Sequence, residues 1–327
     1  MAAAPPPAEE SSVSYEELND LNAEFDDAET ELIRQEAVVK QLLYEKRREL
    51  VSQIPNFWPL VFEQAPPDID EFIQPSDSSL LLNSLISLSV TRFEIEDGKN
   101  GDPRSLCFRF EFSDNDHFED KVIEKKFWQR HSKSGGTALV SEPVEIHWKK
   151  GKDLTGGLLG TVKKVWDAQQ ARAKGGDTKT QGLSADEKSL KKKIENTGLG
   201  GLSFFAWFGY VGRNISAEES QEAVDKAQKK RIARQEGKDQ NAEGEEKEGD
   251  DDDEDDENDL EIFPEGDSLA IHISEDLWPN AIKYFIQAQE QDEASDEDFE
   301  SDADEDNKQQ EEEEASEEEP PAKRRKT

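Results

Sequence analysis

The stretch SYEELNDLNAEFDDAETELIRQEAVVKQLLYEKRRELVSQ, residues 14–53, contains neither glycine nor proline and predicts one continuous helix. Ser14 and Glu17 have the spacing of a capping box at its N-terminus. Pro55 lies just beyond the end of the pattern and predicts that the helix stops there. At about 1.5 Å per residue the helix is roughly 58 Å long, which is longer than an ordinary globular helix.

Apolar residues recur along this helix in alternating steps of three and four, the spacing of a coiled-coil seam. The seam residues are Leu18, Leu21, Phe25, Ala28, Leu32, Val39 and Leu42. Gln35 is the one polar residue that interrupts the repeat. We expect this stripe to mediate dimerisation. The alternative is that the helix packs only on its own domain.

Strand patterns follow the helix and predict an α+β fold. The expected strands are 90–95, 106–112, 122–128 and 144–148. In the second of these, Phe108 and Phe110 alternate with Arg109 and Glu111, as in a half-buried antiparallel strand. The segment 54–62 contains two prolines and reads as a connector to a helix near 79–88. Helices near 204–208 and 278–286 are the candidates to cover one face of the sheet.

The formal net charge of −38 is concentrated in two short runs. Residues 242–259 contain thirteen acidic residues and one lysine, and residues 290–319 contain eighteen and one. Runs of like charge repel themselves and bury no core, so they act as interaction segments. We therefore expect no membrane association and no direct specific binding of nucleic acid, but attraction to a strongly basic partner.

These patterns divide the chain into four parts. We expect a disordered N-terminus at 1–13, the dimerisation helix at 14–53, a folded domain at 54–287 and an acidic disordered tail at 288–327. Flexible insertions are expected within the folded domain at about 156–202 and 216–259. A basic cluster after a proline pair predicts nuclear import, with pairing to the acidic tail as the alternative. Its residues are Lys323, Arg324, Arg325 and Lys326.

No catalytic motif is present, and we expect neither an enzyme nor a cofactor. The single cysteine, Cys107, excludes a cysteine-rich zinc site, and the four histidines are not spaced as a ligand pair. Phosphate-binding glycine loops and a GxSxG motif are missing. No signal peptide and no apolar run of membrane-spanning length is expected.

Five short motifs follow the long helix in a fixed order. They are IPNFW at 54–58, FSDNDHFEDKV at 112–122, EIHWKKGKDLT at 145–155, SFFAWF at 203–208 and DLWPNAIKYF at 276–285. With the acidic tail, this order resembles the nucleosome assembly protein family, in particular its SET-type histone chaperones. The resemblance implies an antiparallel dimer through the long helices. It also implies an earmuff domain of four antiparallel strands backed by helices, with core histones bound on a concave underside.

The resemblance implies a histone chaperone that promotes nucleosome assembly and disassembly through an acidic folded surface and acidic tails. The alternative is a regulatory protein that masks histone tails from acetyltransferases or inhibits a phosphatase. Under this alternative, histone-modifying enzymes are further candidate partners. A nuclear location is expected, with shuttling to the cytoplasm left open. The carboxylates chosen as histone contacts are Asp114, Asp116, Glu119, Asp120, Glu142, Glu145 and Asp153.

One motif departs from the branch. After Phe204 and Phe205 the branch usually has polar residues, whereas this chain has Ala206, Gly209 and Tyr210. If these positions contact histones elsewhere in the family, the contacts are weaker here.

Overall fold

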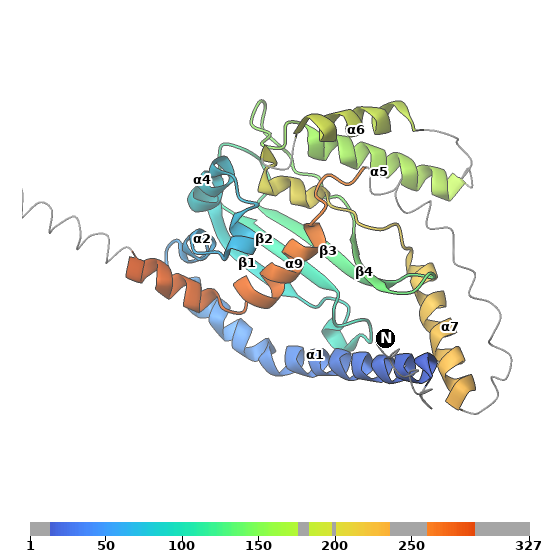
Figure 1. The fold of residues 1–327 in the computed structure, drawn as a ribbon. Helices are drawn as coiled ribbons and strands as arrows, with labels where there is room; N and C mark the ends of the chain where they lie inside the picture. The colour runs from blue at the N-terminus through green and yellow to red at the C-terminus, as the bar shows by residue number, and fades with distance from the viewer. Residues whose placement is uncertain (1–13, 176–182, 198–200, 236–259, 292–327) are drawn as a thin grey trace, which may run out of the picture.

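The computed structural model describes residues 14–175, 183–197, 201–235 and 260–291 (Figure 1). The N-terminal half holds α1 Tyr15–Val51, α2 Phe57–Glu63, α3 Pro67–Asp70, α4 Pro75–Ser84, β1 Leu85–Thr91, η1 Glu96–Gly98, β2 Leu106–Phe112, β3 Val122–His131 and β4 Thr137–Ser141. The remainder holds α5 Leu158–Gly175, α6 Ala185–Thr197, η3 Phe204–Gly209, α7 Ala217–Gln235, α9 Gly266–His272, η5 Ile273–Leu277 and a helix over 281–291.

Helix α1 confirms the long helix predicted from the sequence. The Ser14 hydroxyl accepts a hydrogen bond from the Glu17 amide (3.1 Å), and the Glu17 carboxylate accepts one from the Ser14 amide (2.9 Å), which completes the capping box. Near the other end, Arg47 donates to the carbonyl of Trp278 (2.5 Å) and lies over the rings of Tyr44 and Trp278. Burial lowers the pKa of Arg47 to about 10. The C-terminal half of α1 is therefore fixed to the body.

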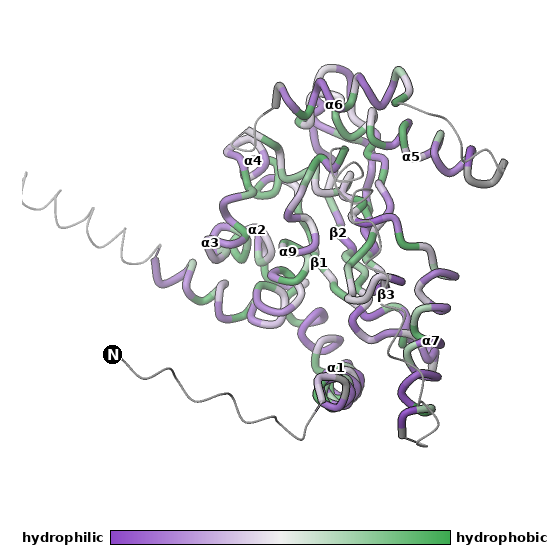
Figure 2. Tube along the Cα trace, turned by 45° about the vertical axis from the view of Figure 1, so that its right-hand side comes forward, coloured by the Kyte–Doolittle hydropathy of each residue, from purple (hydrophilic) through white to green (hydrophobic). Residues whose placement is uncertain are grey.

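The four strands form one antiparallel sheet in the order β1-β2-β3-β4, which confirms the α+β class. Figure 2 shows α1 nearly end-on below this sheet. Strand β2 has the predicted bounds and β3 begins at the predicted residue. The inward side chains of β2 are Phe108, Phe110 and Phe112, and Arg109 and Glu111 lie on the opposite face.

The first strand differs from its prediction. It covers 85–91 rather than 90–95, and helix α4 ends at Ser84 instead of continuing to 88. Leu88 and Val90 are buried while Ser87 and Ser89 are more exposed, so a two-residue alternation was already present in this stretch. Residues 92–95 form a turn, closed by the hydrogen bond from the Ile95 amide to the Arg92 carbonyl (3.0 Å).

The expected fourth strand at 144–148 is also corrected. Strand β4 is 137–141, because Gly135 and Gly136 adopt positive φ angles of 98° and 84° and turn the chain directly back along β3. Residues 144–148 contribute only an isolated bridge between Trp148 and Phe118. Their alternation arises because Ile146 is buried in the core between more exposed neighbours.

Short helix η3 supplies the centre of the core. Phe204, Phe205, Trp207 and Phe208 are fully buried against the inward face of the sheet. The Trp207 ring stacks on Phe127 of β3 at 5.3 Å between centroids. This confirms the cover expected from 204–208. It also explains the departure at Ala206, Gly209 and Tyr210, all of which are buried rather than on the surface.

Four helices lie where the composition predicted a connector or flexible insertions. In α2, Pro59 stands in the first turn, where its missing N–H has no intrahelical acceptor to lose. Within 156–202 the structure has α5 and α6, and Leu158, Val162 and Val165 of α5 are buried. Within 216–259 it has α7, up to residue 235. The spacing of buried residues in α5, not its glycine and lysine content, determines its structure.

Candidate functional site

Two chain segments carry six of the seven carboxylates predicted as ligand contacts. Residues 112–121 connect β2 to β3, and residues 144–153 lead from β4 toward α5. They lie side by side, because the Glu119 amide donates to the His147 carbonyl (3.0 Å) and the Lys149 amide donates to the His117 carbonyl (2.7 Å). We call this pair of segments the loop surface.

An aromatic contact anchors the loop surface to the core. The rings of Phe118 and Trp148 pack edge to face at 5.6 Å, and both contact Phe205 of η3. The Asn115 side chain accepts hydrogen bonds from the amides of His117 (2.8 Å) and Phe118 (3.0 Å) and so turns the first segment. The loop surface is therefore an ordered part of the domain.

The carboxylates of Asp120 and Asp153 accept hydrogen bonds from neighbouring residues of the same two segments or just beyond them. Asp120 accepts from the amide of His147 (2.7 Å) and lies 2.8 Å from its Nδ1, which raises the pKa of His147. Asp153 accepts from the Thr155 amide (2.8 Å), the Thr155 hydroxyl (2.7 Å) and the Gly157 amide (2.8 Å), just before α5. Both residues shape the surface more than they offer charge to a ligand.

Lysines make the loop surface mixed in charge rather than purely acidic. Lys121 forms an ion pair with Asp114 and lowers the pKa of that carboxyl. Lys149, Lys150 and Lys152 are exposed on the second segment. On the described loop surface, the exposed carboxylates for which the structure gives no hydrogen bond or ion pair are Asp116, Glu119 and Glu145.

Glu142 is not brought into this group. It precedes the second segment, and its carbonyl accepts a hydrogen bond from the buried ammonium group of Lys125 (2.7 Å). Its side chain is exposed.

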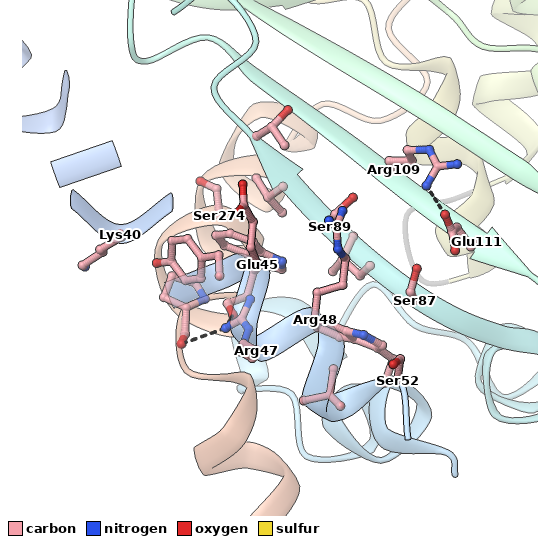
Figure 3. Close-up of a pocket in the computed structure, with 18 of the residues that line it drawn as sticks. Lys40, Glu45, Arg47, Arg48, Ser52, Ser87, Ser89, Arg109, Glu111 and Ser274 are labelled. Atoms are coloured by element: carbon pink, nitrogen blue, oxygen red, sulfur yellow. Dashed lines mark hydrogen bonds and ion pairs between the residues drawn. The ribbon is translucent and has the colours of Figure 1, made fainter. Parts of the chain in front are cut away.

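A large cavity lies elsewhere, between α1 and the outer face of the sheet (Figure 3). Its volume is about 1420 Å³, and Arg48 of α1, Ser87 and Ser89 of β1, and Arg109 and Glu111 of β2 contribute to its lining. None of the seven predicted carboxylates lines it. None of the residues that line this cavity was predicted as a site residue, although the alternation within 106–112 places Arg109 and Glu111 on the face away from the core.

The predicted dimerisation residues of α1 are all exposed in the single chain. The exposed fractions are 52% for Leu18, 49% for Leu21, 62% for Phe25, 63% for Leu32, 73% for Val39 and 74% for Leu42, and Ala28 is also exposed. Soluble monomers rarely leave so long an apolar stripe uncovered.

The remaining predictions concern the import cluster, the acidic runs, metal binding and membrane spans. The import cluster 323–326 and the acidic runs, apart from Glu290 and Gln291, lie outside the described residues. Among the residues with described positions, no group of three or more His, Cys, Asp or Glu side chains could hold a metal ion. Within the same residues, no helix has the length and hydropathy needed to cross a membrane.

The chain is therefore an α+β protein in which a long N-terminal helix with an exposed apolar stripe precedes a domain built on a four-stranded antiparallel sheet. The chain belongs to the nucleosome assembly protein family: the family model described as "Nucleosome assembly protein (NAP)" matches residues 9–288.

Relatives agree with this assignment. A Schizosaccharomyces pombe protein described as a nucleosome assembly protein is 28% identical over 307 residues, which are 91% of this chain and 88% of that protein. Protein SET of Drosophila melanogaster is 32% identical over 160 residues, 46% of this chain and 56% of that protein. The crystal structure of Vps75 has the same fold, with a TM-score of 0.50 and 21% identity over 83% of this chain and 96% of that one.

Proposed function

We propose that this chain is a dimeric, nuclear histone chaperone of the SET type, which binds core histones and passes them to and from DNA. The observation that carries the proposal is the family match over residues 9–288, since the family is described by nucleosome assembly. The net charge of −38 supports a strongly basic ligand.

Dimerisation through α1 is supported by the exposed seam and by the charge of the helix. Residues 15–31 contain eight acidic residues and no basic one, whereas residues 34–48 contain five basic and two acidic residues. Antiparallel pairing of two copies would place the acidic half of one helix against the basic half of the other. Parallel pairing would place like charges together, which is unfavourable.

Histone contact is proposed for the loop surface, with distinct roles for its residues. Asp116, Glu119 and Glu145 would pair with histone lysines and arginines, because their carboxylates are exposed and otherwise unengaged. Asp114 would exchange Lys121 for a histone cation. Asp120 and Asp153 would hold the two segments in shape, and Glu142 would add charge at the edge.

The acidic runs would attract histones from a distance rather than form a specific contact surface. Their charge acts over long distance and is screened by salt, so it speeds encounter with a polycation. Transfer to DNA is favourable because histone binding to DNA releases condensed counterions. The cluster at 323–326 would direct nuclear import.

The proposal is tested with the full chain and with a truncation after Gln291. We expect light scattering to give a dimer, complexes with H3–H4 or H2A–H2B at moderate salt, and plasmid supercoiling when histones and topoisomerase are present. The truncated protein should bind histones more weakly and with a flatter salt dependence. A monomer that forms no complex with either histone pair would overturn the proposal.

A further inference from the structure

Helix α7 connects β3 to the N-terminal half of α1. At its N-terminal end, the Ser220 hydroxyl accepts a hydrogen bond from the His131 amide of β3 (2.9 Å), and Glu222 pairs with Lys133 (3.2 Å). At its other end it reaches the N-terminal half of α1, and Figure 1 shows α7 beside the N-terminal end of α1.

Two ion pairs hold that second end. Arg231 pairs with Asp27 (2.7 Å) and Arg234 pairs with Asp20 (2.9 Å). Asp27, Asp20 and Glu24 together raise the pKa of Arg231. The apolar contribution is small, since Ile232 is 46% exposed. Part-exposed ion pairs of this kind are individually weak and sensitive to salt, so the contact can open without unfolding either helix.

The two surfaces in contact have opposite charge over several turns. Between 226 and 234 α7 has no acidic residue. Arg231 and Arg234 pair with α1, whereas Lys226, Lys229 and Lys230 are exposed and form none of these ion pairs. On α1, Asp20, Glu24, Asp27 and Glu31 follow one another at steps of four, three and four, so they share one face. We call this face the acidic stripe.

The acidic stripe is separate from the dimerisation seam. At about 100° per residue, the stripe lies roughly a quarter to a third of a turn around the helix from the seam of Leu21, Phe25 and Leu32. A second α1 helix packed on the seam therefore leaves the stripe available to another occupant. In this structure the occupant is a basic helix of the same chain.

We propose that α7 is an autoinhibitory latch, whose basic C-terminal turns occupy the acidic stripe of α1 until a polycationic polypeptide displaces them. The ligand class rests on the proposed function, because histones are such polypeptides. A tethered competitor lowers the apparent affinity of an external ligand by the fraction of time it occupies the site. Displacement would expose the acidic stripe to the ligand and free the N-terminal half of α1 from the sheet.

The test compares three double variants of the full chain. Arg231→Gln with Arg234→Gln removes the latch. Lys229→Gln with Lys230→Gln makes the same change of net charge on exposed residues of α7 that form none of the ion pairs with α1. Asp20→Asn with Asp27→Asn opens the latch and also damages the acidic stripe. Amide hydrogen exchange is measured on the free proteins, and binding of poly-L-lysine is measured at moderate salt.

We expect exchange in 15–31 and 226–234 to accelerate in the arginine and aspartate variants and to stay unchanged in the lysine variant. Poly-L-lysine should bind the arginine variant about two- to fivefold more tightly than the lysine variant. It should bind the aspartate variant no more tightly than the wild type. Equal exchange in the arginine and lysine variants, or equal poly-L-lysine affinity, would overturn the latch.

The outcome is separable from that of the proposed function. Hydrogen exchange in the free protein does not depend on whether histones bind. Equally, wild-type complexes with H3–H4 or H2A–H2B would stand if the latch failed this test.

Discussion

The ammonium group of Lys125 donates a hydrogen bond to the carbonyl oxygen of Tyr210, with 2.6 Å between Nζ and O. The carbonyls of Glu142 (2.7 Å) and Phe208 (3.1 Å) accept from the same nitrogen, and the side chain is fully buried. A buried ammonium group is costly unless its N–H groups all find acceptors. This site therefore joins β3 to the chain segments that follow β4 and η3.

Burial lowers the pKa of Lys125 to about 7, against the opposing attraction of Glu261 and Glu142. Between about pH 7 and 10.5 an unfolded lysine is protonated while the folded one is largely neutral, so unfolding takes up a proton. Rising pH in this window therefore stabilises the folded state, by up to about 1.4 kcal/mol per pH unit. Urea unfolding at pH 7 and pH 9.5 measures this contribution.

The control for this prediction is the next residue of β3. Lys125→Met should remove the rise in the free energy of unfolding and destabilise the domain, because three carbonyls lose their donor, each at about 1–3 kcal/mol. Lys126→Met, on the exposed face, should retain the rise. A rise of equal size in both variants would show that Lys125 does not titrate in this window.

Dimerisation is predicted to fail when charge is placed in the seam of α1. Leu32→Asp with Leu42→Asp should give monomers, since each buried leucine contributes roughly 1.5–3 kcal/mol and the new carboxylates must be desolvated. Asn19→Asp with Gln41→Asp adds the same charge at exposed positions outside the seam. That control should remain dimeric in sedimentation equilibrium. A folded dimer in the leucine variant would refute the assigned seam.

Periodicity explains how much of this fold was predictable. The heptad of α1 and the strict alternation of β2 are local signals, and both gave correct elements. Residues 144–148 alternate equally well, yet they form no strand, because Trp148 packs on Phe118 across the sequence. Such a contact has no local signature. The residues of α5 were assigned to a flexible insertion, because their glycine and lysine content obscured the stripe of Leu158, Val162 and Val165.

The candidate site was predictable only in part. The carboxylates within 114–120 and 145–153 are visible in the sequence, but the adjacency of the two segments depends on the backbone hydrogen bonds that Glu119 and Lys149 form across them. The ion pair of Asp114 with Lys121 and the carboxylate bonds of Asp153 could not be read from composition. These contacts separate carboxylates that are available to a ligand from carboxylates that hold the loops.

This separation predicts unequal effects of neutralising acidic residues. Asp116→Asn, Glu119→Gln and Glu145→Gln together should weaken histone binding several-fold, since charge-assisted pairs at an interface contribute about 0.5–1 kcal/mol each when partly exposed. The matched control removes three exposed carboxylates from the region of α3, with Asp68→Asn, Asp70→Asn and Glu71→Gln. Isothermal titration at fixed salt compares the two. Equal losses would mean that net charge alone, rather than the loop surface, governs binding.

The pair of His147 and Asp120 predicts a pH dependence of the loop surface. The hydrogen bond to Asp120 and the charge of its carboxylate raise the pKa of His147, so the imidazolium persists above its ordinary pKa of about 6.5. A group with a raised folded pKa stabilises the folded state at low pH, and this contribution is lost as pH rises through the folded pKa. The effect on unfolding is small here because the His147 side chain is exposed.

The titration itself is the sharper measurement. Proton NMR of the His147 ring should give a pKa above 6.5 in the wild type, and Asp120→Asn should return it toward that value. Asp116→Asn, which removes a carboxylate of the loop surface that does not bond to the ring, should leave it almost unchanged. Because protonation adds a positive charge beside Glu119 and Glu145, polycation binding to the truncated protein should weaken as the pH falls through this pKa. A His147 pKa unaffected by Asp120→Asn would mean that the pair does not form in solution.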